Sequence, residues 1–230
     1  MTQTLSKPRL VIFDVDGVLV DSLAAHLQIC LDKNKEYGLG LTIPDAPSFR
    51  ELVRRGTRIS PMKNLFLAVG FPEKYADKAT EDYRHSFRDQ YPSKMFPGAH
   101  ALLDNLRTAG CQLGIVTGNV KANIVATLGS TLQMFRPDCV ITEDELKGAS
   151  KSDGLTNAMN ASHGSREQTV FIGDQPADRD AARTTGVSFL GVSYGWGITQ
   201  EDSASFPVAT SVTQISDCLL NNSFRSKIDS

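Results

Sequence analysis

Short runs of apolar residues recur along the chain, and each ends in polar or glycine-rich residues. The apolar positions within a run are nearly consecutive, which is typical of strands that are buried on both faces of a sheet. This pattern predicts strands at residues 9–13, 111–117, 138–142, 169–173 and 187–192.

The segments between these runs repeat their apolar residues with the period of a helix. Residues 101–109 place Leu102, Leu103 and Leu106 on one face, and Gly110 follows where a helix commonly ends. The same pattern predicts helices at residues 152–161, 176–185 and 212–220. Alternating strands and helices indicate an α/β fold with a doubly wound, parallel, Rossmann-like sheet. Its ligand site is expected at the carboxyl ends of the strands.

A long interval, from residue 21 to residue 97, lacks this alternation. It holds no convincing strand, but helical periodicity recurs through residue 89. Ser22 is placed to cap a helix, with apolar residues at positions 23, 27, 30 and 31 on one face. A helical insertion after the first strand explains the interval. We therefore predict a catalytic core of residues 1–21 and 95–230 and a helical cap domain of residues 22–94.

Composition limits the function further. The 230 residues are 40% apolar, and 24 Lys and Arg stand against 26 Asp and Glu. This near-neutral balance argues against nucleic-acid binding through a broad basic field. No apolar stretch approaches the ~18 residues of a membrane span, and the first residues lack a signal peptide's apolar segment. We expect no membrane association, a cytoplasmic location, and a monomer or homodimer.

The cysteines and histidines do not suggest a metal site. Four scattered cysteines form no C-x-x-C pair, so buried reduced thiols are expected at Cys30, Cys111, Cys139 and Cys218. The histidines show no metal-ligand spacing, so we expect surface or helix-packing roles for His26, His85, His100 and His163.

Polar side chains gather instead at the ends of three predicted strands. Because these ends lie along one edge of the sheet, their four carboxylates would repel one another and raise one another's pKa values. A divalent cation resolves the conflict, and an all-oxygen ligand set favours Mg²⁺. The residues concerned are Asp14, Asp16, Thr117, Gly118, Asn119, Asp174 and Asp178, with Lys151 preceding the fourth strand.

These residues stand in four motifs that resemble those of the haloacid dehalogenase-type phosphohydrolase superfamily. The motifs are VIFDVDGVLVDS (11–22), IVTGN (115–119), Lys151 and FIGDQPAD (171–178). Three further segments resemble the phosphoglycolate phosphatase-like branch: MFPGAHALLDNLRTAG (95–110), DAARTTGV (180–187) and GVSYGWG (191–197). The resemblance covers almost the whole chain, and the insertion matches that branch's helical, C1-type cap.

The resemblance implies a Mg²⁺-dependent phosphatase that hydrolyses a small, phosphoglycolate-like phosphomonoester through an aspartyl-phosphate. Asp14 would attack phosphorus, and Asp16 would act as acid and then as base. Thr117, Gly118, Asn119 and Lys151 would bind the phosphoryl oxygens. Asp14, the backbone carbonyl of Asp16 and Asp174 would hold Mg²⁺, and Asp178 would either be a further ligand or orient the others.

Two points in this interpretation stay open. The family's lysine is commonly followed by proline, but Ser152 stands here, and Lys147 competes for the role. The spacing to Asp174 favours Lys151.

A phosphomutase similar to β-phosphoglucomutase uses the same core but excludes water from the intermediate. A catalytically silent regulatory protein could also use this fold, although each expected catalytic position holds a suitable residue.

Arginines recur in the predicted cap at positions 50, 54 and 58. If these positions are helical, they form one stripe that could bind a second anionic group of the substrate. A solvated helix face explains the same spacing, and Gly56 weakens the assumption of a helix. Arg54 and Arg58 are accordingly the candidates for substrate specificity in the cap.

Overall fold

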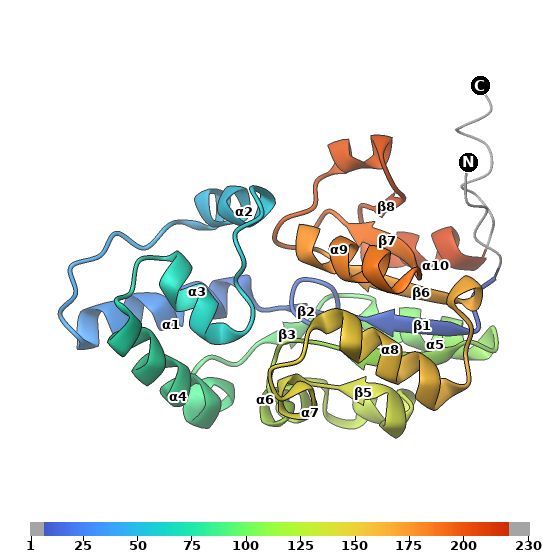
Figure 1. Cartoon of the computed structure of the whole chain (residues 1–230), viewed down its shortest axis with the longest axis horizontal. Coiled ribbons are helices and arrows are strands. Elements are labelled where there is room, and N and C mark those ends of the chain that lie inside the picture. Colours follow the sequence, from blue (N-terminus) through green and yellow to red (C-terminus); the bar gives the residue numbers. More distant parts are fainter. Residues whose placement is uncertain (1–6, 221–230) are drawn as a thin grey trace.

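The computed structural model describes residues 7–220. Within these residues, six parallel strands form the central sheet (Figure 1). They are β1 (Leu10–Phe13), β4 (Gln112–Val116), β5 (Val140–Ile141), β6 (Thr169–Gly173), β7 (Ser188–Val192) and β8 (Val208–Ala209). The order across the sheet is β5-β4-β1-β6-β7-β8, so β1 lies between β4 and β6. The predicted α/β core with a doubly wound parallel sheet is confirmed.

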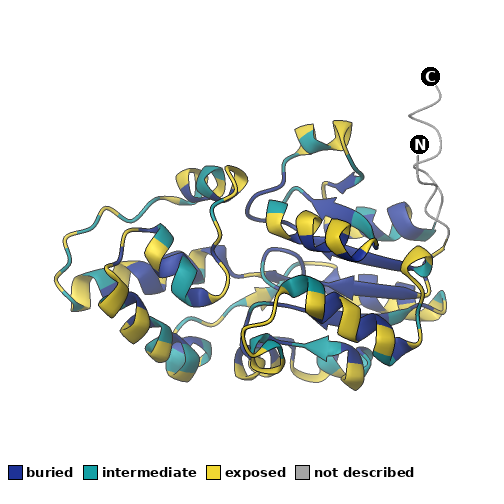
Figure 2. Ribbon diagram, viewed as in Figure 1, coloured by how far each residue is buried: buried dark blue, intermediate teal, exposed yellow. Residues whose placement is uncertain are grey.

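Helices cover both faces of this sheet. Val11 and Phe13 face one hydrophobic cluster, and Leu10 and Ile12 face another, as strand alternation requires. All four side chains are buried (Figure 2), which explains why the sequence shows a continuous apolar run. The first face packs against α5 (Ala99–Thr108), α6 (Lys121–Leu128) and α10 (Val212–Leu220), and the second against α8 (Lys151–Ser162) and α9 (Pro176–Thr185).

Short helical turns connect several of these elements. They are η1 (Gly129–Met134), η2 (Pro137–Cys139), α7 (Glu143–Leu146), η3 (Arg166–Gln168) and η4 (Gln200–Ala204). Pro137 begins the η2 turn, which takes up part of the segment predicted as the third strand. The prediction of a strand over residues 138–142 is therefore wrong at both ends, because only Val140 and Ile141 pair with β4. The other four predicted strands agree with the structure to within one residue at each end.

The helical insertion lies beside the sheet, at the end towards which β1 points (Figure 1). It consists of α1 (Leu23–Glu36), α2 (Ala46–Arg54), α3 (Met62–Ala68) and α4 (Glu73–Gln90). These helices share an apolar cluster that includes Phe49, Phe66 and Phe87, and Val120 and Trp196 of the core also belong to it. The boundaries of the two predicted domains stay a prediction.

Two very short strands connect the insertion to the core. β2 (Val20–Asp21) and β3 (Lys94–Met95) pair in antiparallel fashion, with Val20 opposite Met95 and Asp21 opposite Lys94. The chain therefore leaves and returns at the same place. These strands and β8 were not predicted, because two residues are too few to show a period.

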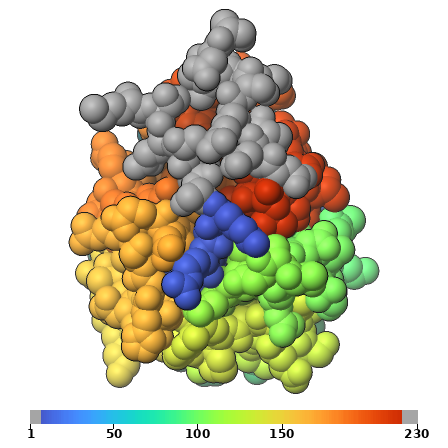
Figure 3. Space-filling view, turned by 90° about the vertical axis from the view of Figure 1, so that its right-hand side faces the viewer, coloured from blue at the N-terminus to red at the C-terminus, as the bar shows by residue number. Residues whose placement is uncertain are grey.

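The opposite end of the core holds the first described residues, which lie between segments coloured orange, red and green (Figure 3). Residues 1–6 and 221–230, which the predicted core includes, lie outside the described residues. No helix within residues 7–220 is long and apolar enough to cross a membrane. All four cysteines are buried and free, as expected.

Candidate active site

Asp14 lies directly after β1, and its backbone is still hydrogen-bonded to a neighbouring strand. Its backbone N–H donates to the carbonyl of Ile172 in β6 at 2.9 Å. Its side chain is buried: Oδ1 accepts the N–H of Val15 at 2.8 Å, and Oδ2 accepts Nζ of Lys151 at 2.9 Å. Burial raises the pKa of Asp14 from its ordinary 3.8 to about 6, although the charge of Lys151 works in the opposite direction.

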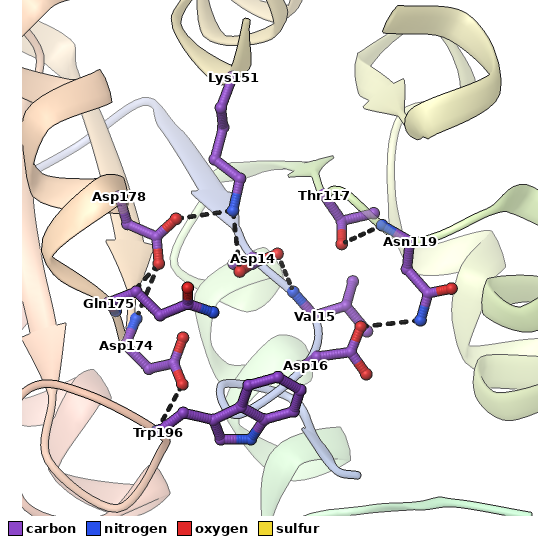
Figure 4. A network of polar contacts seen from close by, with 10 residues as sticks. All are labelled: Asp14, Val15, Asp16, Thr117, Asn119, Lys151, Asp174, Gln175, Asp178 and Trp196. Carbon is purple, nitrogen blue, oxygen red and sulfur yellow. Dashed lines mark hydrogen bonds and ion pairs between the residues drawn. The ribbon is translucent and has the colours of Figure 1, made fainter. Parts of the chain in front are cut away.

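Lys151 is the first residue of α8 and bridges two carboxylates (Figure 4). Its Nζ lies 2.9 Å from Oδ2 of Asp14 and 2.6 Å from Oδ1 of Asp178. Burial tends to lower the pKa of Lys151, but the charges of the two carboxylates outweigh it and hold that pKa above its ordinary value. Lys147 is exposed. The structure therefore brings Lys151, and not Lys147, to Asp14.

Asp174 and Asp178 complete a group of three buried carboxylates with Asp14. Each offers one oxygen, and these oxygens lie within 4.8 Å of one another. Oδ2 of Asp178 accepts the backbone N–H groups of Asp174 and Gln175, both at 3.1 Å. Oδ2 of Asp174 accepts the N–H of Trp196 at 2.7 Å. Backbone N–H groups of two loops thus fix both carboxylates in place.

The second carboxylate oxygen of Asp174 is the feature that most favours a bound cation. Oδ1 of Asp174 is buried and has no hydrogen-bond partner among the described residues. Burial, followed by the charges of Asp178 and Asp14, raises the pKa of Asp174 well above its ordinary value. Three buried carboxylates beside one amine leave negative charge uncompensated. Carboxylate oxygens are hard ligands, so this group fits a divalent metal ion.

Asp16 belongs to a second network, which reaches into the insertion. Its Oδ1 accepts the hydroxyl of Ser22 at 2.5 Å, and its Oδ2 accepts Nδ2 of Asn119 at 2.8 Å. Oδ1 of Asn119 in turn accepts the hydroxyl of Tyr83, from α4, at 2.7 Å. It also accepts the N–H of Val120 at 2.8 Å, which turns the amide nitrogen towards Asp16. The predicted capping role of Ser22 is wrong, because its side chain makes no cap hydrogen bond and binds Asp16 instead.

A pocket of about 410 Å³, counted with its open mouth, lies between the core and the insertion. All four predicted phosphate-binding residues line it, together with the two predicted catalytic carboxylates. Its core wall consists of Asp14, Asp16, Thr117, Gly118, Asn119, Lys151, Gln175 and Trp196. Its other wall consists of His26, Ile59, Ser60, Met62, Leu65 and Tyr83, all from the insertion. Asp174 and Asp178 are not in this lining, and Asp178 contacts the pocket's Lys151.

The predicted arginine stripe does not form. Helix α2 ends at Arg54, and Gly56 follows with a φ of 87°, so Arg58 lies outside the helix. Arg54 pairs with Glu51 at 2.8 Å, and neither Arg54 nor Arg58 lines the pocket. The continuous helical stripe is therefore wrong beyond Arg54. A role for these two arginines in specificity stays a prediction, without support from the pocket.

Several pocket residues escaped prediction. His26 packs its ring 5.0 Å from that of Trp196 and 4.7 Å from that of Phe87, as a helix-packing residue does, but it also lines the pocket. Trp196 is the chain's one tryptophan and stands between two glycines. That unusual setting is a signal that could have found it. Tyr83 gives no such signal, because its contact with Asn119 depends on how α4 packs against the core.

The arrangement is that of a known family. A family model of haloacid dehalogenase-like hydrolases matches residues 11–192, a range that contains Asp14, Lys151 and the other core residues of the site except Trp196. The chain belongs to this family. The chain is 30% identical over 194 residues to the tyrosine-protein kinase PtkA of Mycobacterium tuberculosis, and this match covers 83% of this chain and 64% of the kinase. The chain thus spans less than two thirds of the length of that relative.

The chain is also similar to a second relative and, in its fold, to a solved structure. The phosphoglycolate phosphatase of Pseudomonas fluorescens is 30% identical over 198 residues, which cover 82% of this chain and 71% of that enzyme. The crystal structure of a predicted phosphatase from Clostridium acetobutylicum matches with a TM-score of 0.76 at 24% identity. It covers 94% of this chain and 100% of that one, and it shows that the fold is shared.

Proposed function

We propose that the protein is a Mg²⁺-dependent phosphatase that hydrolyses small-molecule phosphomonoesters through an aspartyl-phosphate on Asp14. One observation carries this proposal: Asp14 touches Lys151 and lies within a buried carboxylate group, at a pocket that Asp16 and Thr117 also line. The phosphoglycolate phosphatase relative supports the same reaction class.

Two carboxylates would divide the chemistry. A carboxylate oxygen of Asp14 attacks phosphorus, the ester P–O bond breaks, and the departing alkoxide takes a proton from Asp16. Asp16 then removes a proton from water, and the water oxygen attacks the phosphorus of the aspartyl-phosphate. The P–O bond to Asp14 breaks, which releases phosphate and restores both side chains. Ser22 and Asn119 hold the Asp16 carboxyl in place for both proton transfers.

The remaining residues would bind and neutralise the phosphoryl group. Lys151, Thr117 and the loop at Gly118 and Asn119 offer donors around the pocket's core wall. Asp14, the backbone carbonyl of Asp16, Asp174 and Asp178 would hold Mg²⁺. When bound, the ion supplies positive charge that offsets the charge of the phosphoryl oxygens.

Phosphate release from a panel of phosphomonoesters tests the proposal. Activity is expected with Mg²⁺ and none with EDTA, and Asp14→Asn should abolish turnover while circular dichroism stays unchanged. Asp104→Asn, at an exposed position of α5, is the matched control and should keep full activity. Turnover that survives Asp14→Asn or metal removal would contradict the mechanism.

The same assay separates hydrolysis from phosphoryl transfer. The kinase relative is named for transfer to tyrosine, and a phosphomutase transfers to a sugar phosphate. Free phosphate should account for all substrate consumed. Phosphotyrosine, or a sugar bisphosphate in place of free phosphate, would show that this chain is a transferase.

A further inference from the structure

The insertion's side of the pocket is an apolar wall close to the reacting groups. Ile59, Met62 and Leu65 line it, and each is at most 5% exposed. Ser60, between the first two, lies so close to Gly118 that a side-chain carbon at Gly118 would overlap its hydroxyl. A larger residue at position 118 would force the Ser60 hydroxyl to move, so the wall directly faces the predicted phosphate-binding loop.

Two polar side chains on this wall are already engaged within the protein. The hydroxyl of Tyr83 donates to Asn119. The ring of His26 lies among the aromatic rings of Tyr83, Phe87 and Trp196. Its Nδ1 lies 2.8 Å from the carbonyl of Ser22, an oxygen that can only accept, so Nδ1 carries a proton.

Positive charge is scarce in the pocket. Among the described residues that line it, Lys151 is the one lysine or arginine, and Asp14 and Asp178 already share its amine. The predicted metal would also be committed, to the carboxylates and the phosphoryl group. A carboxylate on the leaving group would therefore lose its hydration without gaining a cation, which is costly in an apolar setting.

We infer that the preferred substrate is a phosphomonoester of an uncharged alcohol whose apolar or aromatic part packs against Ile59, Met62 and Leu65. This inference rests on the proposed phosphatase function and narrows its substrate class. It also separates the chain from its phosphoglycolate phosphatase relative, whose named substrate carries a carboxylate.

Three benzyl phosphates test the inference, because they differ at a position remote from phosphorus. They are benzyl phosphate, 4-carbamoylbenzyl phosphate and 4-carboxybenzyl phosphate, the last two nearly equal in size. The carbamoyl ester is expected to exceed the carboxyl ester in kcat/KM by about tenfold or more. Phosphoglycolate should fall below benzyl phosphate. Equal or faster turnover of the carboxyl ester would overturn the inference.

A charge added to the wall should weaken the preference. Met62→Lys places an amine on the apolar wall and should shrink the difference between the carbamoyl and carboxyl esters by about tenfold. Met62→Gln is the matched control, since it is polar but uncharged, and should leave the difference in place. A wild-type preference for the carboxyl ester that Arg58→Ala or His26→Gln removes would locate an anion site and overturn the inference.

Binding of non-hydrolysable analogues keeps the two proposals apart. Calorimetry with 4-carbamoylbenzylphosphonate and 4-carboxybenzylphosphonate, in Mg²⁺, should show the same order of affinity. If that order holds but no ester is hydrolysed, the proposed function fails and the inference stands. If esters are hydrolysed but the carboxyl phosphonate binds as tightly as the carbamoyl one, the inference fails and the function stands. Binding of neither phosphonate would also overturn the inference.

Discussion

Replacement of Asp14 by Asn is expected to stabilise the metal-free protein at neutral pH. Burial raises the pKa of Asp14 from 3.8 to about 6, so the folded protein binds this proton more tightly than the unfolded chain does. Ionisation of Asp14 therefore costs folding free energy. At about 1.4 kcal/mol per tenfold change in the ionisation constant, the difference between 3.8 and about 6 corresponds to about 3 kcal/mol.

The pH dependence gives the sign of the effect. Below about pH 4, Asp14 is protonated in both states, so the wild type and Asp14→Asn differ by a constant amount. Between about pH 4 and pH 6 the free energy of unfolding of the wild type falls relative to that of the variant. Above about pH 6 the difference between them has changed by the full ~3 kcal/mol in favour of the variant. Lys151 keeps Asp178 as a partner in the variant.

Urea unfolding in EDTA, followed by circular dichroism from pH 4 to pH 8, measures this difference. The relevant quantity is the variant's free energy of unfolding minus that of the wild type, because titrating groups that Asp14 does not influence then cancel. Saturating Mg²⁺ should remove the variant's advantage, since a metal ion favours the ionised carboxylate. A difference that does not change with pH, or one that moves against the variant as pH rises, would refute the reasoning.

Three further substitutions probe the site. Gly17 has a φ of 78°, and a side chain there would overlap a buried carboxylate. Gly56 has a φ of 87° but open space around it, so Gly17→Ala should destabilise the protein well beyond Gly56→Ala. Urea unfolding compares the two variants. Tyr83→Phe removes the hydroxyl that orients Asn119. The variant should lose about tenfold in kcat/KM for alkyl phosphates but less for 4-nitrophenyl phosphate, because the leaving group of that ester needs no proton. An equal loss on both substrates would contradict this. Lys151→Met leaves two buried carboxylates without their ion-pair partner. It should destabilise the metal-free protein by about 3–5 kcal/mol in the same unfolding assay, and added Mg²⁺ should restore part of this loss. Unchanged stability would contradict the prediction.

The core half of the site could be predicted because strand ends carry it. Asp14, Thr117 and Asp174 each follow an apolar run, and a parallel sheet brings such ends to one edge without any knowledge of packing. Lys151 follows from its spacing along the chain. Lys151 pairs with two carboxylates, and this double pairing depends on the angle at which α8 packs, which the spacing of residues along the chain does not predict.

The insertion half could not be predicted, because helical periodicity shows which face is buried but not what covers it. Tyr83 and His26 both lie on apolar faces, where packing alone would explain them. Their contacts with the core depend on how the insertion docks. The prediction for Ser22 was wrong for a different reason. A hydroxyl before a helix usually caps that helix, but the turn at Gly17 brings the Asp16 carboxylate within hydrogen-bonding distance of the Ser22 hydroxyl.

The antiparallel pairing of β2 and β3 has a consequence for how such a chain can change. Because Asp21 and Lys94 are opposite one another, a short turn could join them without moving any strand of the central sheet. The residues predicted to break the P–O bond lie outside that junction, whereas the wall that faces the leaving group lies inside it. A single exchanged segment could thus give the same hydrolytic machinery a new choice of alcohol, a swap that a gene can make in one recombination.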